Sequence, residues 1–136
     1  MKIVLDTNCL VNIIMPKSYN NDVWLAFRAQ KYYLCVTNEI LFEYHEILTK
    51  RYNNIIANTV LKELIESPNV ERINPTYRFN LITSDRDDNK FVDCAIVAGA
   101  KFIVSNDKHF AELKNYAFPQ VDVCSLADFL DVVRNL

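Results

Sequence analysis

The chain has 136 residues, of which 51% are hydrophobic and 24% are charged, and its formal net charge is -2. This size and composition predict one globular domain over residues 1–136 and exclude a disordered chain. Because the net charge is slightly negative, any contact with nucleic acid must come from local basic patches. The single glycine, Gly99, excludes a Walker loop and a dinucleotide-binding fingerprint, since both need several glycines close to the phosphates.

The strands and helices predicted from the hydrophobic pattern alternate along the chain. Thr37 or Asn38 is expected to cap the third helix, and Asn53 or Asn54 the fourth. Residues 76–88 are the longest irregular stretch. In chain order the predicted elements are strand 3–5, helices 9–15 and 22–31, strand 33–36, helices 38–52 and 54–66, strand 70–73, helix 89–98, strand 102–104, helix 108–116, strand 121–124 and helix 126–134. This alternation predicts an α/β fold with a mostly parallel sheet.

The cysteines and the apolar segments indicate the cellular location. The four cysteines lie one to each apolar segment, and no two form a C-x-x-C pair. A zinc knuckle is therefore not indicated, and we expect free, buried thiols in a reducing compartment. Asp6 interrupts the first apolar run, so no signal peptide is indicated, and no segment approaches the ~20 apolar residues of a membrane span. We expect a cytoplasmic protein with no membrane contact.

Two predicted strands are each followed closely by an aspartate. Asp6 comes directly after residues 3–5, and Asp107 comes shortly after residues 102–104. Ligands of open parallel sheets bind outside the carboxyl ends of the strands, so the two carboxylates would meet if these strands are neighbours. The competing interpretation is that each aspartate only caps the helix that follows it.

Three further acids are candidates because of their positions on helices. The helix around Asp93 is apolar almost all round and should be buried, so its carboxylate needs a basic partner, a metal or a cleft. Glu43 falls at the border of the apolar arc of its helix, and we expect it to point into a cleft. Asp88 is placed to cap the helix of Asp93 and is an accessory candidate.

In their order and spacing these residues resemble the PIN-domain ribonucleases. The run Asp87-Asp88-Asn89-Lys90-Phe91, with the later Asp107-Lys108, is similar to the subgroup of toxins from toxin–antitoxin systems. The resemblance covers essentially the whole chain. It implies a PIN-like three-layer sandwich with the strand order 3-2-1-4-5, a homodimer and an antitoxin partner. The family's acidic quartet and its adjacent polar position match Asp6, Glu43, Asp93, Asp107 and Asn8.

The chemistry of these residues agrees with that resemblance. An all-oxygen ligand set suits Mg²⁺ or Mn²⁺ rather than zinc. We expect Asp6, Asp93 and Asp107 to bind the metal and Glu43 to position or deprotonate the attacking water. Asn8 and Ser105 would orient the carboxylates. The predicted activity is metal-dependent endonucleolytic cleavage of RNA phosphodiester bonds.

The remaining candidates are less specific. RNA could contact basic residues, although each is also explained as solvated surface charge: Lys50, Arg51, Lys90 and Lys108. His45 and His109 share no ligand spacing, so we expect them to be surface or capping residues. Phe42 is expected on the outward face of its helix. It is explained either as a single exposed apolar residue, which is common, or as part of a dimer or antitoxin contact.

Two other functions are compatible with parts of the pattern. The chain could be a non-catalytic PIN-like module that binds RNA or protein, but a loss of acidic residues would be expected of such a module. A phosphatase of the haloacid-dehalogenase type also begins with a strand and an aspartate. That chemistry requires a second aspartate two positions later, and this chain has Asn8 there.

Overall fold

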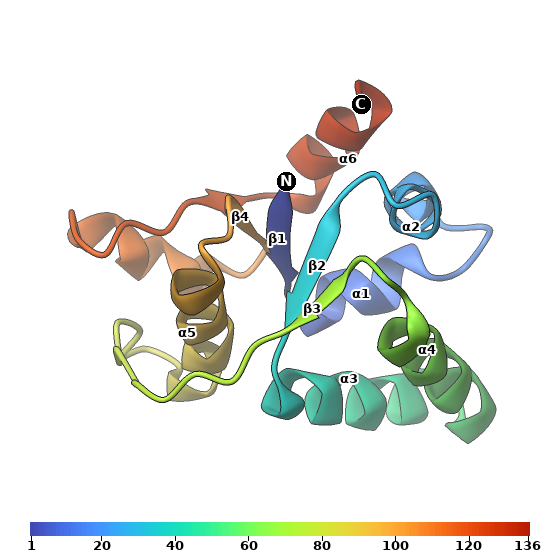
Figure 1. Cartoon of the computed structure of the whole chain (residues 1–136), viewed down its shortest axis with the longest axis horizontal. Coiled ribbons are helices and arrows are strands. Elements are labelled where there is room, and N and C mark those ends of the chain that lie inside the picture. Colours follow the sequence, from blue (N-terminus) through green and yellow to red (C-terminus); the bar gives the residue numbers. More distant parts are fainter.

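The computed structural model describes residues 1–136 and contains one five-stranded sheet. All neighbouring strands are parallel, and their order is β3-β2-β1-β4-β5. The α/β class and the strand order are therefore confirmed (Figure 1). The elements are β1 (Lys2–Leu5), α1 (Thr7–Ile13), α2 (Asn21–Arg28), β2 (Tyr33–Val36), α3 (Asn38–Arg51), α4 (Asn54–Glu66), β3 (Val70–Arg72), η1 (Arg86–Asp88), α5 (Asn89–Ala98), β4 (Phe102–Val104), η2 (Lys108–Asn115), β5 (Val123–Cys124) and α6 (Leu126–Arg134).

The first strand is central because it is apolar on both faces. Ile3, Val4 and Leu5 are fully or almost fully buried, as expected for a strand covered on both sides by helices. In register, Ile3 pairs with Leu34 of β2, while Leu5 pairs with Val104 of β4. The ends of β1 and β4 are therefore side by side, and the residues that follow them begin at the same edge of the sheet.

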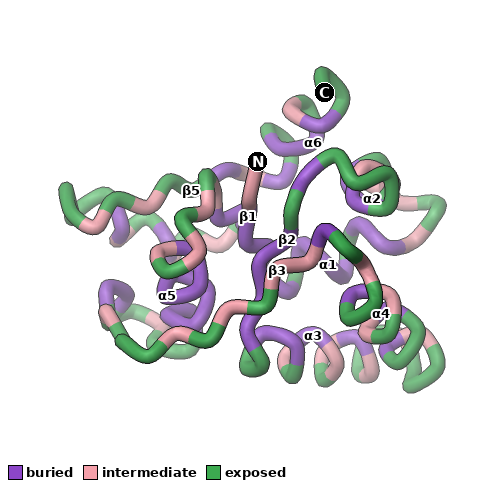
Figure 2. The backbone as a smooth tube through the Cα atoms, viewed as in Figure 1, coloured by how far each residue is buried: buried purple, intermediate pink, exposed green.

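Helices cover both faces of the sheet and make three layers. The α5 helix packs on β1, β2 and β4, whereas α1, α2 and α4 lie on the other side of the sheet (Figure 1). Buried residues concentrate in the central strands and in α5 (Figure 2). The four cysteines are buried and free, as predicted. No helix combines the length and the apolarity that crossing a bilayer requires.

Some element boundaries differ from the predictions. The α1 helix begins at Thr7 rather than at Cys9, because the backbone carbonyl of Asp6 already accepts from the N–H groups of Cys9 and Leu10. Residues 108–115 form a 3₁₀ helix, η2, rather than an α-helix. The side chain of Asp107 accepts from the N–H of His109 and tightens the first turn of η2.

The irregular stretch before α5 is tied down by side chains. Asn89 Oδ1 accepts from the N–H of Ile82 at 2.8 Å, and Asn89 Nδ2 donates to the carbonyl of Ile82 at 2.9 Å. The Glu112 carboxylate accepts from the N–H groups of Thr83 and Ser84 at 2.9 and 2.8 Å. These bonds hold the chain immediately before residues 85–88 against α5 and η2.

The clamp formed by Asn89 should be a large local contribution to stability. Asn89→Ala leaves the buried N–H and carbonyl of Ile82 without partners, so we expect it to lower the free energy of unfolding by about 2–3 kcal/mol. Urea unfolding measures this change. Asn115→Ala, at an exposed position, is the matched control and should stay within about 0.5 kcal/mol of the wild type. Equal effects of the two substitutions would show that the clamp contributes nothing.

Candidate active site

Asp6 lies at the carboxyl end of β1 and is 6% exposed. Its backbone N–H donates to the carbonyl of Val104 at 3.0 Å, and its Oδ2 accepts from Ser105 Oγ at 2.7 Å. Asp6 occupies the N-cap position of α1, but its side chain makes no capping bond to that helix and accepts from Ser105 instead. Burial raises the pKa of Asp6, the hydrogen bond from Ser105 lowers it in part, and the negative charges of Asp107 and Glu43 raise it further.

Asp107 reaches the same edge from the end of β4. Its N–H donates to Ser105 Oγ at 2.9 Å, and its Oδ1 accepts from the N–H of His109 at 2.9 Å. Asp107 is therefore a cap for η2 as well as a neighbour of Asp6. Asp6, Asp107 and Asn8 line one cavity of about 320 Å³. The hydroxyl of Ser105 joins the two aspartates, as the sequence suggested for an orienting residue.

Asp88 is the third carboxylate of this group. It ends η1 directly before α5 and is 8% exposed. Asp88 occupies the N-cap position of α5, as predicted, but its side chain makes no capping hydrogen bond there. Asp88 Oδ2 is shielded from solvent and has no hydrogen-bond partner. Burial, and then the negative charges of Asp85, Asp107 and Asp6, raise the pKa of Asp88 to about 6.

Asp93 is buried, as predicted, but the structure does not bring it together with Asp6 and Asp107. Its Oδ1 accepts from the N–H of Phe79 at 3.1 Å. Burial raises the pKa of Asp93, while this N–H and the charge of Arg78 lower it. Residues five positions apart on an α-helix point about 140° apart, so Asp88 and Asp93 face different surroundings. The Arg78 guanidinium pairs with Glu39 at 2.9 Å and acts on Asp93 only as a nearby positive charge.

Glu43 of α3 lies close enough to Asp6 for its charge to raise the pKa of that aspartate. The hydroxyl of Thr7 donates to the Glu43 carboxylate, and Lys90 Nζ lies 2.8 Å from Glu43 Oε1. The Lys90 side chain is 8% exposed and also lies 2.9 Å from Asp87 Oδ2. Burial alone would lower the pKa of Lys90, but the ion pairs with Glu43 and Asp87 outweigh it and raise the pKa. The positive charge of Lys90 is thus paired with carboxylates of the protein itself.

His109 is a member of the site that the sequence pattern did not indicate. Its Nδ1 lies 3.1 Å from Asp107 Oδ1, 3.5 Å from Asp88 Oδ2 and 3.8 Å from Asp85 Oδ2. None of these contacts has hydrogen-bonding geometry, and Nδ1 is shielded from solvent. The one available signal was its position two residues after an aspartate that follows a strand.

The residues at this edge fit a divalent cation. We call Asp6, Asp85, Asp88, Asp107 and His109 the acidic edge. Possible ligand atoms of Asp85, Asp88 and His109 lie within 4.8 Å of one another. The buried, unpartnered oxygen of Asp88 is the kind of group that a cation would satisfy. Clustered carboxylates are also the ligands that hard divalent cations prefer.

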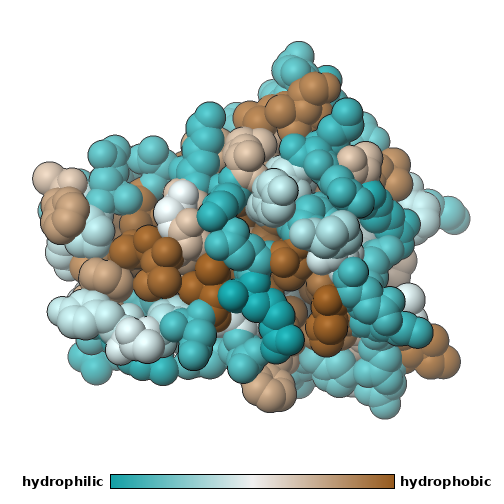
Figure 3. Space-filling view, in the orientation of Figure 1, coloured by the Kyte–Doolittle hydropathy of each residue, from teal (hydrophilic) through white to brown (hydrophobic).

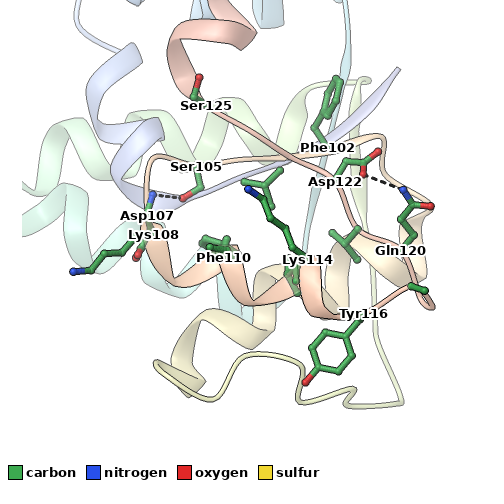
Figure 4. A pocket seen from close by; sticks show the side chains of 15 residues that line it. Phe102, Ser105, Asp107, Lys108, Phe110, Lys114, Tyr116, Gln120, Asp122 and Ser125 are labelled. Carbon is green, nitrogen blue, oxygen red and sulfur yellow. Dashed lines mark hydrogen bonds between the residues drawn. The ribbon is translucent and has the colours of Figure 1, made fainter.

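The other predicted RNA-binding residues lie around the site at different distances. Lys50 is exposed and lies 3.8 Å from Glu46, while Arg51 lines a surface hollow together with Asn8. Lys108 lines a cavity of about 930 Å³ that begins at Ser105 and Asp107. Figure 4 shows the Lys114 side chain extending across this cavity toward Ser105, whereas Lys108 points away from it.

The raised pKa of Asp88 predicts a specific dependence of stability on pH. The folded protein holds this proton more tightly than the unfolded chain, in which aspartates titrate near 3.9. Ionisation of Asp88 therefore destabilises the wild type as the pH rises from about 4 through the folded pKa of about 6. With chelator present, Asp88→Asn should match the wild type near pH 4 and exceed its free energy of unfolding by about 1–2 kcal/mol near pH 7.

The control for this measurement is Asp131→Asn, which changes an exposed aspartate of α6. Its difference from the wild type should not change over the same pH range. A difference for Asp88→Asn that is equally independent of pH would contradict the burial and charge crowding described for Asp88.

Comparison with solved structures identifies several similar folds. The VapBC2 structure from Rickettsia felis, bound to a DNA fragment from its promoter, matches with a TM-score of 0.62, 19% identity, and 92% and 98% coverage of this chain and that chain. VapC20 from Mycobacterium tuberculosis, a toxin that cleaves the sarcin-ricin loop, matches with a TM-score of 0.59, 14% identity and coverages of 80% and 92%. FitAcB from Neisseria gonorrhoeae matches with a TM-score of 0.56, 16% identity and coverages of 92% and 98%.

Sequence comparison gives the family. No curated protein sequence shows significant similarity to the chain. A profile of the PIN domain, however, matches residues 2–109, from β1 to the start of η2. This match includes Asp6, Glu43, Asp88 and Asp107, and it agrees with the strand order and with the structural neighbours. The chain belongs to the PIN domain family.

Proposed function

We propose that this protein is a divalent-metal-dependent endoribonuclease whose metal-binding carboxylates are Asp6, Asp88 and Asp107. The observation that carries the proposal is the crowding of these three carboxylates at one edge of the sheet, with a buried Asp88 oxygen that no protein group satisfies. In this proposal Asp88 takes the place that the sequence suggested for Asp93. Asp93 is already bonded to the backbone of Phe79 and has a structural role.

The surrounding side chains hold the carboxylates in place. Ser105 fixes Asp6, while Thr7 and Lys90 fix Glu43. A bound Mg²⁺ or Mn²⁺ would supply Lewis-acid activation of the attacking water and charge stabilisation at the phosphate. Glu43 would orient that water, and Asn8 lines the same cavity as Asp6 and Asp107.

The RNA strand needs a path past these carboxylates. We place it along the cavity beside Asp107, because Lys114 extends through that cavity and Lys108 stands at its rim (Figure 4). The partly buried Phe102 and the exposed Tyr116 line the same cavity and offer aromatic surface for an unstacked base. A single strand fits this approach better than a duplex, since its bases are free to stack on side chains.

The structural neighbours support a role in a toxin–antitoxin pair. One neighbour is a toxin that cleaves the sarcin-ricin loop, and another is solved as the VapBC2 assembly. We propose that this chain is also such a toxin, with an antitoxin protein as its partner. Phe42 is 77% exposed on α3 beside Glu43 and suits such a contact. Other apolar side chains form separate patches between hydrophilic ones on the face in Figure 3. A homodimer and a cytoplasmic location stay predictions.

The alternative of a non-catalytic binding module is less well supported. A module that only binds RNA or protein gains nothing from carboxylates that repel one another at a buried edge. The folded state of this chain nevertheless retains Asp6, Asp88, Asp107 and Glu43 together. We therefore favour catalysis over simple binding.

Cleavage assays separate the proposed ligand from the buried aspartate of α5. Asp6→Asn, Asp88→Asn and Asp107→Asn should each lower cleavage of structured RNA by at least about 100-fold, because each removes a cation ligand. Chelator should abolish the wild-type activity. Asp93→Asn should stay within about tenfold of the wild type when folded, because Asp93 is not one of the proposed cation ligands. Full activity of Asp88→Asn together with an inactive, folded Asp93→Asn would reverse this assignment.

The proposed RNA path predicts which lysines contribute to binding. The double substitution Lys108→Ala and Lys114→Ala should weaken the affinity of catalytically inactive Asp6→Asn protein for single-stranded RNA. It should also make the slope of log K against log salt shallower by about 0.7 for each lost phosphate contact. The control is Lys62→Ala on the exposed side of α4, which should change neither quantity. An unchanged slope for the double variant would place the RNA elsewhere.

A further inference from the structure

The imidazole of His109 occupies an unusual position at the acidic edge. Three carboxylate oxygens from separate residues lie 3.1, 3.5 and 3.8 Å from its Nδ1. A ring nitrogen so placed would ordinarily form a hydrogen bond with one of them. Here Nδ1 and Asp88 Oδ2 are both shielded from solvent, and neither has a hydrogen-bond partner.

Hydrogen bonds to the local backbone occupy some of the carboxylate oxygens near His109 and leave others without a partner. Asp85 accepts from the N–H of Asp87 through Oδ1, and Asp107 accepts from the N–H of His109 through Oδ1. Asp85 Oδ2 and Asp88 Oδ2 have no such bond and lie 3.8 and 3.5 Å from the ring nitrogen, whereas the nearer Asp107 Oδ1, at 3.1 Å, is already bonded to the His109 N–H. The short helices η1 and η2 therefore present one nitrogen and two carboxylate oxygens to a common point.

The spacing of these atoms is that of ligands sharing one ion. Neighbouring ligands of an octahedral cation with bonds of about 2.1 Å are about 3 Å apart, and longer bonds or wider angles increase this separation. The separations of 3.5 and 3.8 Å between Nδ1 and the two free oxygens lie slightly above that value. A small contraction around a cation would bring all three atoms within bonding distance of it.

We propose that His109 Nδ1 is a ligand, together with Asp85 and Asp88, of a divalent cation at the acidic edge, and that this nitrogen makes the position prefer Mn²⁺ to Mg²⁺. The inference rests on the proposed function, since it assumes that the acidic edge binds a cation. Mg²⁺ holds oxygen ligands and waters almost exclusively, whereas first-row transition ions also accept imidazole. Carboxylates keep Mn²⁺ among the ions that fit, so the mixed set selects Mn²⁺ from the two.

The chain offers a matched control for this inference. It contains two histidines, and the other, His45, bonds to Asn58 on the surface formed by α3 and α4. Pulsed electron paramagnetic resonance of bound Mn²⁺ detects nitrogen nuclei in its ligand shell without any enzymatic turnover. The samples are wild type, His109→Ala, His109→Gln and His45→Ala, each checked for folding by circular dichroism.

The expected result is histidine nitrogen coupling in the wild type and in His45→Ala, and its loss in both His109 variants. By calorimetry the wild type should bind Mn²⁺ at least about tenfold more tightly than Mg²⁺, and the His109 variants should lose most of that preference while Mg²⁺ affinity changes less than about threefold. Two His109 variants are used so that a folding defect in one does not end the experiment.

Two results would overturn the inference and are distinguishable. Tight Mn²⁺ binding without nitrogen coupling, or coupling that persists in the His109 variants, would exclude His109 as a ligand and leave the proposed nuclease function intact. An absence of Mn²⁺ and Mg²⁺ binding by the wild type would overturn both the inference and the metal dependence of the proposed function.

Discussion

The crowding of carboxylates at the ends of β1 and β4 is the constraint on which the rest of the site depends. Parallel strands end at one edge, and the pairing of Leu5 with Val104 places Asp6 next to residues 105–107. Burial raises the pKa values of Asp6 and Asp88, and the repulsion between the carboxylates raises them further. This repulsion opposes folding at neutral pH. A hydrophobic core of 37 buried residues holds the strands together against it. The fold thus concentrates negative charge at an edge where hydrogen bonds stabilise the carboxylates only in part.

The negative charges on the two sides of this edge are not equally matched by basic side chains. Glu43 is matched by Lys90 and Thr7, so the α3 side carries an internal ion pair and one charge-assisted hydrogen bond. On the other side Asp88 has no basic group beside it except the imidazole of His109. Positive charge is therefore lacking at the acidic edge and not at Glu43. A divalent cation would supply that charge, which is the physical reason for proposing one between the strand ends and η1.

Site residues could be predicted from the sequence where the local hydrophobic pattern determines their position. They could not be predicted where their position depends on the path of an irregular segment. Asp6 and Asp107 were predictable because strand ends of a parallel sheet share an edge. Burial of Asp93 was also predictable from the apolar helix around it, but its partners were not. Phe79 and Arg78 belong to residues 76–88, whose course depends on contacts such as those of Asn89 and Glu112. The same segment brings Asp85 and Asp88 to His109. Neither the surroundings of Asp93 nor the group around His109 could therefore be predicted from residue spacing alone.

The central claim is that Asp6, Asp88 and Asp107, rather than Asp93, surround the catalytic cation. Anomalous X-ray scattering from crystals grown with Mn²⁺ tests this claim most directly, because it locates the ion without reference to activity. We expect a strong anomalous peak within bonding distance of carboxylate oxygens of Asp88 and of at least one of Asp6 and Asp107. A peak bound to Asp93, or none at the ends of β1 and β4 in crystals of the folded, metal-saturated protein, would contradict it.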